Sequence, residues 1–214
     1  MISLILIALL SYLVGSFPTS VVWGRITRKI DIREYGSKNA GGTNAFRVLG
    51  WQAGLLVAMV DVGKGMLAAA LISKIRIDPL SLDHELVQII AGTCAVIGHI
   101  WTVLAMFKGG KGVATAAGVL ISIYPWAALI CLAIFVTVVV ITRYVSVASI
   151  AATSSLPIVL LFLDRMAGAT VSKSFLLFSV VIGGLICFTH RANIRRLIEG
   201  TENRFGKNPF KKNA

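Results

Sequence analysis

The chain has 214 residues, of which 57% are hydrophobic and only 14% are charged, whereas about 25% charged residues is typical of a soluble domain. This composition excludes a disordered chain and argues against a water-soluble enzyme, so we expect a membrane protein with several spans and a single domain, residues 1–214. The net charge of +12 does not indicate nucleic-acid binding, because membrane proteins collect Lys and Arg in their cytoplasmic loops. The three cysteines lie in apolar runs without metal-ligand spacing, so we expect neither disulfides nor a metal site.

Seven apolar segments are candidates for transmembrane helices, since a bilayer core needs about 20 apolar residues per helix and a bundle tolerates shorter runs. The first is too long, and too free of an early basic cluster, to be a cleavable signal peptide. Tyr124-Pro125 divides the apolar stretch 113–142, because proline disfavours a helical conformation in the residue before it. The predicted fold class is therefore all-α with seven transmembrane helices, and six is the competing count. The segments are 2–23, 50–72, 86–106, 113–124, 126–142, 147–163 and 174–189.

The distribution of basic residues decides between the two counts. With seven spans and the N-terminus outside, the inner segments hold 16 Lys and Arg and the outer segments hold four. With six spans, the C-terminal tail and its seven cations would lie outside. Because Lys and Arg accumulate on the cytoplasmic side, we predict seven spans, an outer N-terminus and a cytoplasmic C-terminus. The basic stretch from His190 is expected to lie along the inner membrane surface, where anionic lipid would attract it.

The first predicted cytoplasmic loop, residues 35–47, is suited to a phosphate. It reads Tyr-Gly-Ser-Lys-Asn-Ala-Gly-Gly-Thr-Asn-Ala-Phe-Arg. Its glycines allow sharp turns that present backbone N–H groups, and Arg47 adds a planar cation that matches a phosphate. An ordinary polar loop is the alternative interpretation. The side chains that add further donors are Ser37, Asn39, Thr43 and Asn44.

A second predicted cytoplasmic loop, residues 107–112, reads Phe-Lys-Gly-Gly-Lys-Gly. Its flexible backbone around Lys108 and Lys111 suits an oxyanion. It is not a P-loop, since Ala105 stands where that motif has its first glycine and Gly112 follows the lysine. A basic loop that only sets topology is the alternative.

Three ionisable residues lie within the predicted spans, where a charge costs several kcal/mol by most scales and is therefore functional or paired. Asp61 and Lys64 are three residues apart on one helical face, so an internal ion pair is the simplest interpretation. His99 follows Gly98 and suits either a structural hydrogen bond or a catalytic base.

Two more polar groups lie near the predicted inner membrane face. His190 and Asn193 would share a face if the last span continued past its end. Ser146 and Ser149 lie just inside the inner end of the sixth span. With seven spans, all the phosphate-suited groups lie on the cytoplasmic side. This arrangement predicts a cytoplasm-facing anion site among apolar helices and a substrate with a phosphate and an apolar part.

These motifs, taken in order, resemble those of the bacterial acyl-phosphate:glycerol-3-phosphate acyltransferases (the PlsY family), from about residue 11 to residue 206. Three positions depart from the family pattern: Lys38 replaces a glycine, Gly42 replaces an alanine, and Thr102 stands where a proline is usual. The motifs that carry the resemblance are Gly36-Ser-Lys-Asn-Ala-Gly-Gly-Thr-Asn44 with Arg47, Asp61-x-x-Lys-Gly65, Gly98-His99 leading to Phe107-Lys-Gly-Gly-Lys-Gly-Val-Ala-Thr115, Arg143-Tyr-Val-Ser146, and His190-Arg-x-Asn193.

The resemblance implies a multi-pass enzyme of phospholipid synthesis in the bacterial inner membrane, with its active site facing the cytoplasm. It would transfer a fatty acyl group from acyl phosphate to the 1-hydroxyl of glycerol 3-phosphate, giving lysophosphatidic acid and inorganic phosphate. It implies no cofactor and no nucleic acid, contact with membrane lipid, and a functional link to the soluble enzyme that makes acyl phosphate. The catalytic residues it implies are Ser37, Arg47, Lys111, His190 and Asn193. The expected substrate-binding residues are Gly36, Asn39, Thr43, Asn44, Asp61, Lys64, His99, Lys108, Gly109, Gly110, Ser146 and Ser149.

Phosphate is a competent leaving group, so direct attack by the glycerol hydroxyl would need positioning and charge stabilisation but no protein nucleophile. The His-x4-Asp motif of soluble-type glycerolipid acyltransferases is absent after each of the three histidines. The proton acceptor is His190, Asp61 or a phosphate oxygen of the substrate, and we prefer the last. A small organic-phosphate transporter or channel is the alternative function. It is disfavoured because the sequence has no inverted repeat of broken helices.

Overall fold

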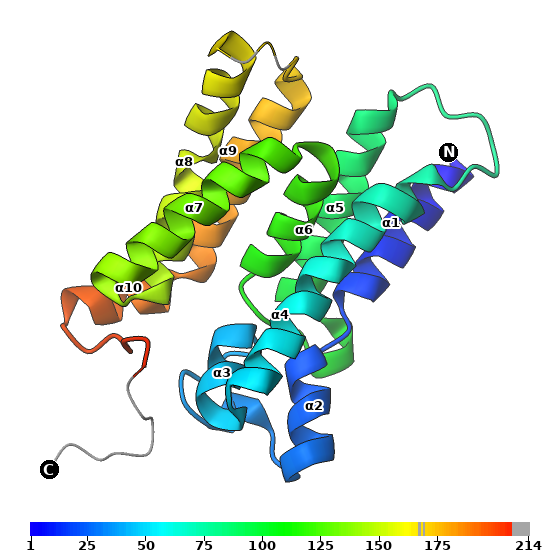
Figure 1. Ribbon diagram of the computed structural model, residues 1–214. Coiled ribbons are helices and arrows are strands. Elements are labelled where there is room, and N and C mark those ends of the chain that lie inside the picture. The colour runs from blue at the N-terminus through cyan, green and yellow to red at the C-terminus, as the bar shows by residue number, and fades with distance from the viewer. Residues whose placement is uncertain (167, 169, 207–214) are drawn as a thin grey trace, which may run out of the picture. The chain divides into compact units, whose positions relative to one another are not determined.

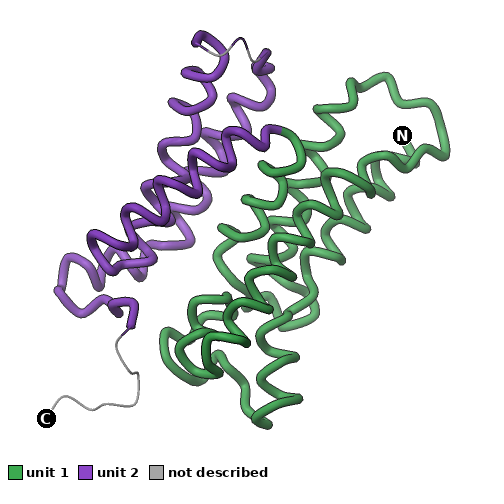
Figure 2. Tube along the Cα trace, in the orientation of Figure 1, with its two compact units in different colours: residues 1–123, 208–214 green, residues 124–207 purple. Residues whose placement is uncertain are grey.

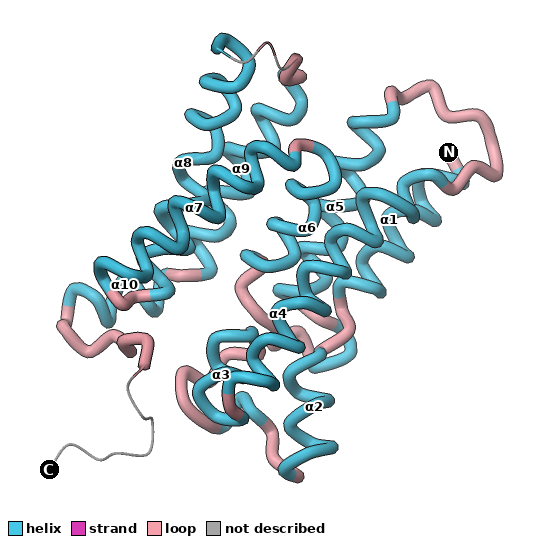
Figure 3. Tube along the Cα trace, in the orientation of Figure 1, coloured by secondary structure: helices cyan, strands magenta, loops and turns pink. Residues whose placement is uncertain are grey.

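The computed structural model describes residues 1–166, 168 and 170–206, and all regular secondary structure in these ranges is helical. The chain forms two compact units, one reaching to Ile123 and the other starting at Tyr124 (Figure 2). Helices make up most of each unit, and loops of different lengths connect them (Figure 3). The expectation of one domain over residues 1–214 stays a prediction.

In the first unit, α1 packs along α5, while α4 packs against both α3 and α6 (Figure 1). A π-helical turn (Leu67–Leu71) and a 3-10 turn (Ile72–Lys74) extend α4. The bounds are α1 (Ile2–Gly15), α2 (Thr19–Arg28), α3 (Gly42–Leu49), α4 (Trp51–Met66), α5 (His84–Ile100) and α6 (Val113–Ile123).

In the second unit, α8 packs against both α7 and α9. The predicted turn at Tyr124-Pro125 is confirmed: Tyr124 has non-helical dihedral angles and Pro125 is the first residue of α7. Proline fits that position because the first N–H group of a helix has no partner within the helix. The bounds are α7 (Pro125–Thr142), α8 (Val145–Met166), α9 (Lys173–Thr189) and α10 (Arg191–Ile198).

The first predicted span is broken. The sequence predicts one helix over 2–23, but α1 ends at Gly15 and α2 begins at Thr19. Pro18 explains the break, since it has no N–H to donate and it disfavours a helical conformation at Phe17. The interruption leaves backbone polar groups between the two helices available for side chains of other elements.

Five helical segments of the described chain are long and apolar enough to cross a membrane, and the bent pair of α9 and α10 is a sixth. Every one of the seven predicted segments contains a helix. However, α6 has only 11 residues, about 16 Å at 1.5 Å per residue, against a hydrocarbon core of about 30 Å. The structure therefore supports five or six spans, and seven spans and the orientation of the termini stay predictions. The five segments are Ile2–Arg28, Trp51–Lys74, His84–Ala105, Pro125–Thr142 and Val145–Met166.

Two buried apolar clusters hold the first unit together. One joins α1, the extension of α4, and α5 through Ile7, Ala68 and Val87. The other joins α2, α3 and α4 through Val21, Val48 and Val57. The second cluster fixes the segment that contains the first glycine-rich motif.

Candidate active site

The first phosphate-suited motif is only partly a loop. The sequence predicts a loop over 35–47, but α3 begins at Gly42 and carries Asn44 and Arg47. The helix forms because Ala45 and Val48 are apolar at helical spacing and bury one face of α3. Thr43 and Arg47, four residues apart, consequently share a face of α3. Ser37 and Asn39 lie on the remaining loop, and all four of these polar residues are partly buried.

Asn44 holds this loop in place. Its side chain is 1% exposed; its Oδ1 accepts from the backbone N–H of Ser37 at 2.8 Å, and its Nδ2 donates to the carbonyls of Ile32 and Tyr35 at 3.1 and 3.0 Å. The backbone of Gly36, with φ of 59°, lies against the Asn44 side chain, and a Cβ at Gly36 would lie 2.4 Å from Oδ1 of Asn44. Asn44 and Gly36 were expected to bind substrate, whereas these contacts shape the loop that presents Ser37.

Lys38, which stands where the family has a glycine, adopts the left-handed backbone conformation, with φ of 59°. Glycine takes this conformation freely, whereas a residue with a Cβ pays about 1–2 kcal/mol for it. The N–H of Lys38 donates to the carbonyl of Tyr35 at 3.0 Å, which closes the turn. The turn therefore forms with a lysine at this position.

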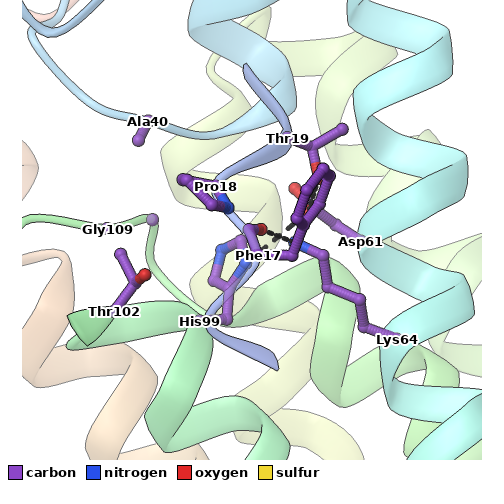
Figure 4. A pocket seen from close by; sticks show the side chains of 10 residues that line it. Phe17, Pro18, Thr19, Ala40, Asp61, Lys64, His99, Thr102 and Gly109 are labelled. Atoms are coloured by element: carbon purple, nitrogen blue, oxygen red, sulfur yellow. Dashed lines mark hydrogen bonds and ion pairs between the residues drawn. The ribbon is translucent and has the colours of Figure 1, made fainter. Parts of the chain in front are cut away.

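The predicted ion pair inside the spans is confirmed. Nζ of Lys64 lies 2.6 Å from Oδ1 of Asp61, and the two side chains are only 5% and 2% exposed. Thr19 donates to the same carboxylate oxygen at 3.2 Å, and Nδ1 of His99 lies 3.7 Å from it. Lys64 also donates to the carbonyl of Phe17 at the break between α1 and α2 (Figure 4). The break thus supplies two partners, Thr19 and the Phe17 carbonyl, that sequence spacing did not indicate.

The second glycine-rich motif is docked on the C-terminal end of α5. The N–H groups of Gly109 and Gly110 donate to the carbonyls of Ile100 and His99, at 3.1 and 3.0 Å. Lys108 is exposed, whereas Lys111 is partly buried. Thr102 replaces the usual proline with a proline-like φ of −69°, and its buried hydroxyl donates to the carbonyl of Ser16.

Arg33 connects the segment that precedes the first motif to the segment that precedes the second. Its role was not identified from the sequence. Its guanidinium donates to the carbonyl of Ala105 at 2.8 Å and forms an ion pair with Asp31 at 2.7 Å. The side-chain hydrogen bond from Arg33 holds the pKa of the Asp31 carboxyl well below its usual range. Acidic residues on both sides of Arg33, Asp31 and Glu34, were the only available signal, and the Ala105 carbonyl that Arg33 contacts lies 72 residues away.

A small cavity lies where these elements meet (Figure 4). The volume open to the centre of a water molecule is about 10 Å³, roughly the room that one water requires. The break, α4, α5 and both motifs all contribute to it. Its lining residues are Phe17, Pro18, Thr19, Ala40, Asp61, Lys64, His99, Thr102, Gly109 and Gly110.

Two of the polar residues predicted in the second unit, Ser146 and Asn193, meet at Glu202, a residue that was not identified from the sequence. Its carboxylate accepts from Ser146 at 2.9 Å, Asn193 at 2.6 Å and Arg196 at 2.7 Å. Burial by itself would raise the pKa of Glu202, but the hydrogen bonds from Asn193, Arg196 and Ser146 outweigh it and the pKa is lowered. The basic stretch after His190 contains two glutamates, Glu199 and Glu202, and nothing in their spacing indicated which of them would be buried.

The last predicted helix does not continue straight. α9 ends at Thr189, and α10 leaves it at an angle of 58°. His190 occupies the bend, is buried, and its Nδ1 lies 2.8 Å from the carbonyl of Ile186. Because a carbonyl only accepts, Nδ1 is the ring nitrogen that carries the hydrogen in this contact. The hydroxyl of Ser149 donates to the carbonyl of Val145 within α8 at 2.8 Å.

The structure therefore gathers the predicted residues in two groups, each within its own unit. In the second unit, Ser146 and Asn193 meet at Glu202, while Ser149 and His190 bond to their own helices. The first unit holds Gly36, Ser37, Asn39, Thr43, Asn44, Arg47, Asp61, Lys64, His99, Lys108, Gly109, Gly110 and Lys111.

Comparison with known proteins identifies the family. The profile of the glycerol-3-phosphate acyltransferase family matches residues 5–200. A glycerol-3-phosphate acyltransferase of Chlorobium luteolum is 45% identical, with 97% of this chain and 99% of that protein covered. One from Chlorobium phaeobacteroides strain BS1 is 47% identical, with 95% and 97% covered.

Two solved structures are also similar. The crystal structure of PlsY, an integral membrane glycerol 3-phosphate acyltransferase, is 38% identical in its glycerol 3-phosphate form, with a TM-score of 0.82. The lysophosphatidic acid form gives a TM-score of 0.79. Each comparison covers 95% of this chain and 96% of the other. On the family match over residues 5–200, the chain belongs to the glycerol-3-phosphate acyltransferase family.

Proposed function

We propose that this protein transfers a fatty acyl group from acyl phosphate to the 1-hydroxyl of glycerol 3-phosphate, giving lysophosphatidic acid and inorganic phosphate. The observation that carries the proposal is its likeness, over 95% of the chain, to PlsY structures in glycerol 3-phosphate and lysophosphatidic acid forms. Two glycine-containing motifs, with Arg47 and Lys111 on them, give the first unit groups suited to phosphate. The apolar helices around them suit the acyl chain.

Each unit contains residues that we propose to handle phosphate. In the first, Arg47 would grip phosphate oxygens through its planar fork, while Lys111 would act as a compact charge within a flexible turn. Ser37 and Thr43 add hydroxyl donors. In the second unit, His190, Asn193 and the hydroxyl of Ser149 are proposed to donate hydrogen bonds to phosphate. Except for Asp61, Lys64 and His99, the other substrate-binding residues named from the sequence remain proposals of the same kind.

The reaction balances without a protein nucleophile. The hydroxyl oxygen of glycerol 3-phosphate attacks the acyl carbon, an ester bond forms, and the bond from that carbon to the phosphate oxygen breaks. The hydroxyl proton passes to an acceptor, and phosphate leaves. Cations held close to both phosphates would stabilise the charge that develops in the transition state.

A substrate phosphate oxygen is our preferred proton acceptor. Asp61 is a weaker candidate because its carboxylate is 2% exposed and already accepts from Lys64 and Thr19. His190 stays a candidate. We therefore assign the residues positioning and charge stabilisation rather than an obligatory acid–base role.

Acyl phosphate is the proposed donor because the loops between the described helices form no additional domain that could bind the nucleotide and pantetheine of acyl-CoA. The test uses protein purified in detergent, acyl phosphate and glycerol 3-phosphate, and detects lysophosphatidic acid by mass spectrometry. Turnover with acyl phosphate is expected, with and without a chelator. Efficient turnover with acyl-CoA alone would contradict the donor assignment, and no product from either donor would refute the proposed function.

We also propose that the protein lies in the bacterial inner membrane with its active site facing the cytoplasm. The 16 Lys and Arg assigned to inner segments, against four in outer ones, support this orientation. The soluble enzyme that makes acyl phosphate would then release its product on the same side. No cofactor is required by the proposed chemistry.

A further inference from the structure

The glycine loop of residues 108–112 lies directly against His99. A Cβ built on Gly110 would be 2.1 Å from Nε2 of the His99 imidazole. A Cβ built on Gly109 would instead be 2.0 Å from the backbone oxygen of His99. Neither glycine has a positive φ, so both are required by close approach rather than by backbone conformation. Gly110 thus leaves room for the side chain of His99, and Gly109 leaves room for the backbone of the same residue.

The His99 imidazole contacts Gly110 on its Nε2 side and faces Asp61 on its Nδ1 side. Nδ1 of His99 faces Oδ1 of Asp61 at 3.7 Å, and Asp61 is bound by Lys64 at 2.6 Å and by Thr19 at 3.2 Å. Lys64 in turn donates to the carbonyl of Phe17. A continuous set of contacts therefore runs from the break between α1 and α2, through α4 and α5, to the glycine loop (Figure 4).

The space around these three side chains is too small for a substrate phosphate. The cavity they line holds about one water molecule (about 10 Å³ open to a water centre). Asp61 and Lys64 direct their charges at each other, and His99 is 7% exposed. Lys111, by contrast, belongs to the loop itself and is partly buried.

On the basis of the proposed function, we propose that Asp61, Lys64 and His99 are positioning residues, which hold the loop that carries Lys111 without touching the substrate. This assignment replaces the substrate-binding role that the sequence suggested for the three. The loop has no regular secondary structure of its own, so its place is fixed by what it rests on. A displacement of about 1 Å at a catalytic group can cost roughly 100-fold in rate.

The test is a pair of double-mutant cycles that share His99→Ala. Gly110→Ala should lower kcat/KM by about 100-fold or more, because the new methyl group occupies the space of the imidazole. His99→Ala alone should cost roughly 10-fold. In the double variant the methyl group has room, so its kcat/KM should lie within about threefold of His99→Ala. Gly109→Ala is the matched control, since His99→Ala leaves the backbone oxygen in place and should not rescue it.

Positioning is distinguished from simple destabilisation by the kinetic constants. A protein that is only less stable contains less active enzyme, which lowers kcat and leaves both KM values unchanged. His99→Ala should instead raise the KM of one phosphate substrate by about 10-fold and change the KM of the other by less than threefold. Should Gly110→Ala fail to fold, recovery of folded protein by adding His99→Ala, without such recovery for Gly109→Ala, supports the same contact.

Two results would overturn the inference. If the Gly110→Ala and His99→Ala losses multiply in the double variant, the imidazole acts independently of the loop, as a group that binds substrate would. If His99→Ala rescues Gly109→Ala equally well, the effect does not come from the contact seen at Gly110. Inactivity of the unsubstituted enzyme would refute the proposed function itself, whereas an active enzyme with either pattern refutes only this inference.

Discussion

Glu202→Ala is the most informative single change in the second unit. Glu202 is 8% exposed, and its carboxylate receives hydrogen bonds from Ser146, Asn193 and Arg196 at 2.6–2.9 Å. Truncation would leave two buried donors and one charged donor without this acceptor. Removing one partner of a buried ion pair costs about 3–5 kcal/mol, and the 30% exposure of Arg196 places the expected loss of stability near the lower value, about 3 kcal/mol.

The change should also reduce catalysis, because Asn193 is held in place by Glu202 and is proposed to bind phosphate. We expect at least a 30-fold loss of kcat/KM, which corresponds to about 2 kcal/mol. Glu202→Gln keeps the shape and an acceptor oxygen, so it should cost less on both measures. Thermal unfolding in detergent and initial rates of lysophosphatidic acid formation measure the two effects. A Glu202→Ala protein with normal unfolding temperature and normal rate would refute the role assigned to this cluster.

The pH dependence of this cluster has a defined sign. The pKa of Glu202 is lowered in the folded protein from its ordinary value of 4.5. The stabilisation is therefore fully present above pH 4.5 and is lost as the pH falls through the lower, folded-state value. The unfolding temperature of the unsubstituted protein should fall more steeply below pH 4.5 than that of Glu202→Gln. Parallel curves for the two proteins would contradict the assigned pKa direction.

Three further results are expected. Arg47→Ala and Lys111→Ala should each lower turnover by roughly 30- to 1000-fold, the value of a charge-assisted contact in a partly desolvated site. As the control, substitution of the exposed Arg28 by alanine should lower turnover by less than about threefold. Near-normal turnover by Lys111→Ala would refute the phosphate site. Lys38→Gly should raise the free energy of unfolding by up to about 1 kcal/mol, because glycine adopts a φ of 59° without strain, and a lower unfolding temperature would contradict this. A cysteine placed at position 213, outside the described residues, in a cysteine-free background should resist impermeant thiol reagents added to intact cells, and labelling from outside would refute the predicted orientation.

The sequence alone located the apolar helices. Each of the seven apolar segments contains a helix, and the division at Tyr124-Pro125 falls where it was predicted. Such features are local: an apolar run in a membrane must satisfy its backbone hydrogen bonds within itself, and proline acts on its neighbour. The ion pair of Asp61 and Lys64 was predictable for the same reason, because residues three apart meet on any helix.

The environment of the site depended on tertiary structure. Pro18 was visible in the sequence. The sequence did not indicate that the break at Pro18 would supply Thr19 and the Phe17 carbonyl as partners for a cluster on α4 and α5. Glu202 lies 56 residues from Ser146, and Gly110 gave no sign that its missing side chain makes room for His99. Motif residues could be listed from the sequence because their chemistry is local. Which of them face a substrate and which hold another residue in place depends on contacts between distant segments, and only the packing of the helices determines those contacts.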